Sequence, residues 1–105
     1  MGEVFLLYEY EEDYEKLADT PLVYATLDGA IAEVESRRIP VVDVETARGT
    51  EYLPSHGCCE REGEYRLKSR SEYIDMWVAE PFVKGTDHRV LGAPLVIVER
   101  VGVNE

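Results

Sequence analysis

The stretch that most constrains the fold lies at the start of the chain, where an apolar run is followed directly by acidic residues. Residues 4–8 are apolar at every position, which is typical of a strand covered on both faces. Residues 9–15, which we call the acidic segment, carry five carboxylates with two tyrosines between them. We therefore expect one element that begins in the core and ends in solvent as a negative, aromatic surface.

The negative charge of the chain is concentrated in its first third. The net charge is −11, and residues 1–35 hold ten acids against one base, Lys16, so this third carries −9. Direct binding to nucleic acid or to an anionic membrane is disfavoured, because phosphate groups would be repelled. The asymmetry favours a basic protein as partner. The alternative is a salt-adapted surface, for which a composition rich in acids and poor in lysine is equally typical.

Length and hydropathy indicate one soluble domain over residues 1–105. Hydrophobic residues make up 45% of the chain, far more than in a disordered chain. No apolar run approaches the ~20 residues that span a bilayer, and no basic region followed by an apolar one marks a signal peptide. We therefore expect a cytoplasmic protein, while the oligomeric state is left open.

One helix is predicted over residues 27–38. Its apolar positions recur at helical spacing and form one stripe, which consists of Leu27, Ala30, Ile31 and Val34. Thr26 is of the residue type that caps helix N-termini. Arg37 and Arg38 would fall in the last turn, where positive charge suits the helix dipole, and Pro40 would stop the helix.

The remaining segments are predicted to form strands, separated by one long loop over residues 46–63 with a short extended piece at 51–53. Residues 71–83 fit a helical stripe as well as a strand; the strand is favoured, with Pro81 ending it. The strands expected beside residues 4–8 are 22–25, 41–45, 64–70, 71–83 and 94–101. The order predicts an α+β fold, with a mainly antiparallel sheet of about five to six strands and one helix packed on one face.

A second group of candidate residues lies in the long loop and beyond it: His56, Cys58, Cys59, Asp87 and His88. Adjacent cysteines rarely form a disulfide with each other. They are also poorly placed to bind one ion together, since zinc sites usually separate paired cysteines by about two to four residues. We expect no metal and no cofactor. A small metal-binding protein or thiol enzyme that uses the His56–Cys59 loop through a Cys–His pair is the alternative function.

Several short motifs resemble those of small bacterial and phage proteins of unknown function. They are Val4–Tyr10 with the pattern V-F-L-L-Y-x-Y, residues 23–26 ahead of the helix, and Trp77 followed by residues 80–82. The resemblance implies a protein of a phage or mobile element, which would act in the host cytoplasm. It carries no activity over to this chain.

The acidic segment is the best candidate for a contact surface. Carboxylates on alternate residues of a strand lie ~6.8 Å apart, which roughly matches the phosphate spacing along one nucleic-acid strand, and tyrosine is enriched in interface cores. We therefore expect a non-catalytic inhibitor that mimics nucleic acid and binds a basic protein or nucleic-acid-binding complex, as a phage anti-CRISPR protein does. The predicted partner-binding residues are Glu9, Tyr10, Glu11, Glu12, Asp13, Tyr14 and Glu15.

Overall fold

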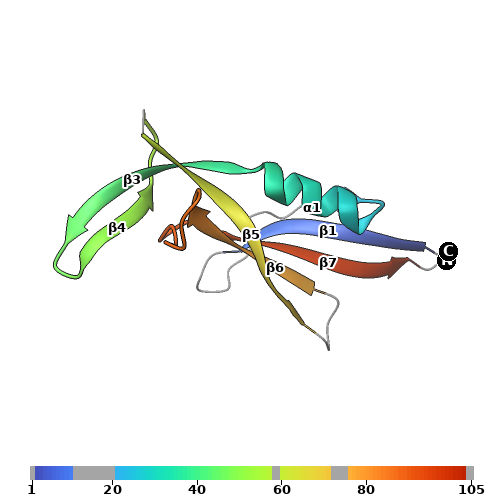
Figure 1. The fold of residues 1–105 in the computed structure, drawn as a ribbon. Coiled ribbons are helices and arrows are strands. Elements are labelled where there is room, and N and C mark those ends of the chain that lie inside the picture. Colours follow the sequence, from blue (N-terminus) through green and yellow to red (C-terminus); the bar gives the residue numbers. More distant parts are fainter. Residues whose placement is uncertain (1, 11–20, 58–59, 72–75, 104–105) are drawn as a thin grey trace.

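The chain forms a curled antiparallel sheet with a helix on one face (Figure 1). The computed structural model describes residues 2–10, 21–57, 60–71 and 76–103. In chain order the elements are β1 (Gly2–Tyr10), β2 (Leu22–Tyr24), α1 (Leu27–Ser36), β3 (Arg38–Thr46), β4 (Gly49–Pro54), β5 (Arg61–Ser71), β6 (Met76–Val83) and β7 (Leu95–Val103). The predicted α+β class is confirmed, but seven strands in these ranges exceed the five to six expected.

The strand order across the sheet is β2-β1-β7-β6-β5-β3-β4. β1 and β7 pair over nine residues, from Gly2 opposite Val103 to Tyr10 opposite Leu95. This confirms the interior position predicted for the C-terminal strand. β2 pairs with β1 on the other side, as expected, but through only three residues. In the described part of the chain, α1 spans ten residues and no helix is long and apolar enough to cross a bilayer.

The helix α1 begins where it was predicted and ends two residues earlier. Thr26 is its N-cap, and the Thr26 side-chain oxygen accepts a hydrogen bond of 3.1 Å from the Gly29 backbone N–H. The expectation that Arg37 and Arg38 occupy the last turn was wrong, since Arg37 is the C-cap and Arg38 belongs to β3. The physical reason is Pro40, whose ring in a continuing helix would clash with the carbonyl of Ser36.

The apolar stripe of α1 packs on the sheet face formed by β1, β7, β6 and β5. Val34 and Ala30 are fully buried at 0% exposure, Leu27 packs against the same cluster, and Ile31 is half-buried. The sheet side of this cluster consists of Phe5, Leu7, Tyr65, Ala79, Val96 and Val98. Fully burying one such aliphatic side chain stabilises the fold by ~1.5–3 kcal/mol, so this contact holds the helix in place.

Strands β3 and β4 form a hairpin that extends beyond the part of the sheet covered by the helix (Figure 1). Gly49 ends the tight turn with φ of 120°, which favours glycine. The Thr46 hydroxyl donates a hydrogen bond of 2.9 Å to the Gly49 carbonyl across the turn. The loop predicted over residues 46–63 was therefore wrong in part. Residues 49–54 pair with β3 as β4, which includes the extended piece expected at 51–53, and β5 already begins at Arg61. Residues 47–48, 55–57 and 60 lie outside strands, as predicted.

Gly63 in β5 and Pro81 in β6 lie in strands although neither was predicted to do so in this way. Gly63 lies where β5 passes β3, and a Cβ there would come within 3.1 Å of Val41 and Val90 side chains. Pro81 lies inside β6 and does not end it. Proline is tolerated there because β7 pairs with β6 only up to Ala79. Of the strand predicted over 71–83, residues 72–75 lie outside the described residues, and β6 itself begins at Met76.

Substitution of Val34 tests the helix–sheet contact. Val34→Asp would place an unpaired carboxylate at a fully buried position, so we expect the free energy of unfolding to fall by ~3 kcal/mol or more. Ala32→Asp is the matched control, because Ala32 is exposed on the same helix. Chemical denaturation of both variants measures the difference, and equal stabilities would contradict this packing.

Candidate functional site

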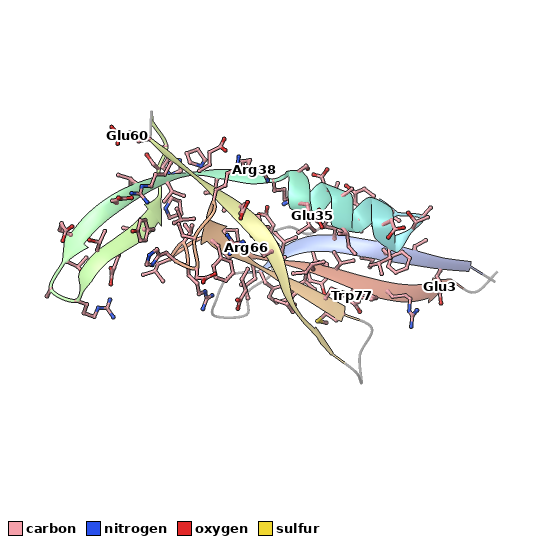
Figure 2. All side chains as sticks on the ribbon, in the orientation of Figure 1. Glu3, Glu35, Arg38, Glu60, Arg66 and Trp77 are labelled. Carbon is pink, nitrogen blue, oxygen red and sulfur yellow. The ribbon has the colours of Figure 1, made fainter. Side chains whose placement is uncertain are left out.

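A recess of about 420 Å³ lies where the end of α1 meets β1, β3 and β5. Figure 2 shows Arg38 at this junction, where the chain leaves the helix and enters β3. The recess combines four charged side chains at its rim with apolar and aromatic walls. Its lining residues are Glu9, Glu33, Arg37, Arg38, Ile39, Pro54, Tyr65, Ala93 and Pro94.

Arg37 is the centre of the charged rim. Its Nη1 donates a hydrogen bond of 2.7 Å to Oε1 of Glu9, and its Nε lies 3.7 Å from Oε1 of Glu33. The first contact ties the end of the helix to β1, 28 residues earlier in the chain. The Arg37 Nε is buried and has no hydrogen-bond partner among the described residues. Two carboxylates therefore share one guanidinium, and this group carries a net negative charge.

Arg38, the other cation of the recess, is turned toward the end of the helix. Its Nη1 donates hydrogen bonds of 2.6 Å to the Glu35 carbonyl and 2.9 Å to the Arg37 carbonyl. These are carbonyls that a helix C-terminus leaves without intrahelical partners. The negative end of the helix dipole thus stabilises the positive charge of Arg38, which is one of the two cations that line the recess.

Tyr65 forms the buried wall of the recess. Its hydroxyl donates a hydrogen bond of 2.8 Å to the Pro94 carbonyl. Burial is the main cause that raises the pKa of Tyr65 from 10.0 to about 12; the Glu9 carboxylate contributes to this rise, and the Arg37 guanidinium opposes it.

Of the acidic segment, the structure describes Glu9 and Tyr10, and it places their side chains on opposite faces of the sheet. Glu9 is half-exposed and turns to the helix side of the sheet, where it pairs with Arg37. Tyr10 lies on the opposite face and packs its ring on Tyr8, with ring centroids 5.3 Å apart. Tyr8 in turn donates a hydrogen bond of 2.8 Å to Glu99. The other predicted partner-binding residues, Glu11, Glu12, Asp13, Tyr14 and Glu15, lie outside the described residues.

The arginines and lysines of the described side chains are almost all engaged within the chain. Besides Arg37, six of them lie within 4.0 Å of a carboxylate: Arg48, Arg61, Arg66, Lys84, Arg89 and Arg100. Within these same described ranges, exposed carboxylates without such a pair are found at Asp28, Glu35, Glu45 and Glu60. Intramolecular pairing thus leaves an excess of exposed carboxylates among the described residues.

The residues of the alternative metal or thiol site do not form a group in the part of the chain that the structure places. The His88 ring stacks on Tyr52, with centroids 5.2 Å apart, and Asp87 lies 3.6 Å from Arg66. His56 is exposed, while Cys58 and Cys59 lie outside the described residues. Across the described ranges, no three histidine, cysteine, aspartate or glutamate residues are grouped so that they could hold a metal ion.

Comparisons of the chain with protein-family models, with curated proteins and with solved structures found no match. The candidate site therefore rests on the geometry of the recess and on the charge around it. The acidic segment pointed to Glu9 as a site residue, whereas Arg37, Tyr65 and Pro94 were not predicted to belong to the site. The spacing of Glu33 and Arg37 at i and i+4 was the one available signal, since such pairs meet on a helix surface.

The pKa of Tyr65 predicts how stability changes in alkali. Because the folded state holds the phenol proton up to about pH 12 and the unfolded chain only up to about pH 10, this contribution is fully present below pH 10 and is lost as pH rises toward 12. Tyr65→Phe should therefore reduce the fall in the free energy of unfolding over this window. Urea denaturation from pH 8 to 11.5 measures it; an unchanged pH dependence would contradict the assignment.

Removal of metal tests the alternative site. We predict that dialysis against a strong chelator leaves the melting temperature unchanged, because the described residues offer no ligand group. Metal analysis of the purified protein is the accompanying measurement. One equivalent of zinc per chain, lost together with stability, would instead favour a site that includes His56, Cys58 and His88.

Proposed function

We propose that the protein is a non-catalytic binding module that docks a basic, nucleic-acid-binding protein or complex and inhibits it by mimicking nucleic acid, as an anti-CRISPR does. The observation that carries the proposal is the internal pairing of the cations described above. Because most arginines and lysines of the described side chains are paired within the chain, unpaired carboxylates predominate among the exposed charges of the described residues, and the whole chain carries −11. The proposal assigns the contact to the acidic segment, Glu9–Glu15.

The position of the first third of the chain supports this proposal. It contributes β1, β2 and α1, which lie together at one end of the sheet. The described residues of this third hold five acids and no base: Glu3, Glu9, Asp28, Glu33 and Glu35. A field of one sign over one region accelerates encounter with a partner of opposite charge. The same field repels phosphate, which disfavours nucleic acid itself as the ligand.

A salt-adapted surface predicts the same composition, and the two are separated by experiment. After affinity capture of the partner from the native host, binding is compared for the wild type and for a variant with Glu11, Glu12, Asp13 and Glu15 replaced by their amides. Glu9 is left unchanged, because its carboxylate is already paired with Arg37. The matched control replaces Asp28, Glu35, Glu45 and Glu60 by their amides, which removes the same charge from exposed positions outside the acidic segment that have no ion pair among the described residues.

Single exposed ion pairs contribute only ~0–1 kcal/mol, so the four substitutions of the acidic segment should weaken binding by roughly 100-fold, mainly through slower association. The control should change it far less. Wild-type affinity should fall steeply with salt, since the Debye length is ~8 Å at physiological ionic strength, and the module should displace a DNA or RNA duplex from its partner. Affinity that ignores both the amides and the salt would end the proposal.

A further inference from the structure

We infer that the recess between α1, β1 and β5 is a socket for one arginine side chain of the partner, with the guanidinium held by Glu9 and Glu33 and its aliphatic part against the apolar walls. This inference rests on the proposed function, because it names the partner group that one site of the module would take. It concerns the recess alone and does not depend on the acidic segment beyond Glu9.

The form of the recess suits a long side chain with a charged end. Its volume of about 420 Å³ falls within the ~300–1,000 Å³ typical of small-ligand sites. The apolar part of the lining is formed by Ile39, Pro54, Ala93 and Pro94, and methylene groups of arginine bury well against such surfaces. Glu9 and Glu33 line the same recess, so a side chain whose stem lies along this apolar wall would reach them with its head group.

The carboxylates retain the capacity to accept hydrogen bonds. Glu33 lies 3.7 Å from the Arg37 Nε, which is longer than a hydrogen bond, and Glu9 uses one oxygen for Arg37. The side chains of both glutamates are partly open to solvent, with exposed fractions of 39% for Glu9 and 38% for Glu33. The Glu33 carboxylate in particular makes no hydrogen bond of normal length to Arg37, so it can accept hydrogen bonds from an incoming cation.

Arginine fits this arrangement better than lysine or an anion. A guanidinium is planar, weakly hydrated and able to bridge two carboxylates, whereas an ammonium is compact and strongly hydrated. An anion would find the free Arg37 Nε attractive, but it would also meet Glu9 and Glu33 at close range. The chain as a whole, at −11, disfavours anions as well.

The test is an NMR titration of the full chain with N-acetyl-arginine-methylamide. The readouts are the Arg37 Nε–H signal and the backbone amides of Tyr65 and Ala93, which line the recess. The uncharged citrulline analogue, the lysine analogue and sodium acetate are titrated in parallel. We expect weak, saturable shifts with the arginine analogue, smaller shifts with lysine, and none with citrulline or acetate.

Two variants of equal charge change make the test specific to the recess. Glu33→Gln alters the rim, whereas Glu35→Gln alters an exposed residue of the same helix that does not line the recess. Affinity for the arginine analogue should fall by roughly threefold or more in the first variant and stay near the wild-type value in the second. Equal losses in both variants would show attraction by net charge only and would overturn the socket.

Other outcomes also overturn the inference: equal shifts with citrulline, or shifts at the recess with acetate and not with arginine, which would assign it to an anion. Failure of the socket is distinguishable from failure of the proposed function. If partner binding depends on the acidic segment while the recess ignores arginine, only the socket is lost. If no basic partner binds while the recess still selects arginine through Glu33, only the proposed function is lost.

Discussion

The ladder between β1 and β7 is the interaction on which the rest of the structure depends. Its nine residue pairs join the two ends of the chain and form the floor on which α1 packs. Leu7 and Val98 are paired across the ladder and both belong to the core under Val34. On the opposite face, the same ladder brings Tyr8 to Glu99, whose hydrogen bond joins residues 91 positions apart. Contacts of this sequence separation carry a large loop-closure cost, which burial on both faces must offset.

The recess follows from this arrangement and from the position of Pro40. Because the helix must end at Ser36, Arg37 leaves it as an extended residue and reaches back to Glu9 on β1. Tyr65 on β5 closes the recess from behind, and its hydroxyl is held by the Pro94 carbonyl just before β7. Segments from four parts of the chain thus meet at one point. They place two glutamates, Glu9 and Glu33, beside two arginines, Arg37 and Arg38.

Charge links this recess to the proposed role of the module. Most cations of the described residues are held in ion pairs along β3, β5, β6 and β7, and the carboxylates that remain are exposed. On a charged binding surface of this kind, each exposed ion pair contributes little binding free energy alone. Selectivity for one partner arises where a recess fits a particular side chain. The recess offers such a shaped contact, because a guanidinium seated there would be partly removed from solvent and therefore more strongly attracted.

Features that arise from local sequence patterns could be predicted without the structure. The stripe ending at Val34 predicted the helix, alternation predicted most of β5, and the count of acids placed the charge in the first third of the chain. Partner strands were decided only by the tertiary structure. Residues 49–54 carry loop-like signals and become β4 because β3 pairs with them, and Pro81 is accommodated in β6 because β7 ends its pairing at Ala79. The same holds for the candidate site: the sequence indicated Glu9 as an exposed acid, but it did not indicate that Glu9 pairs with Arg37. Strand pairing depends on which distant segments of the chain share a sheet, and local composition does not specify that partner or its register.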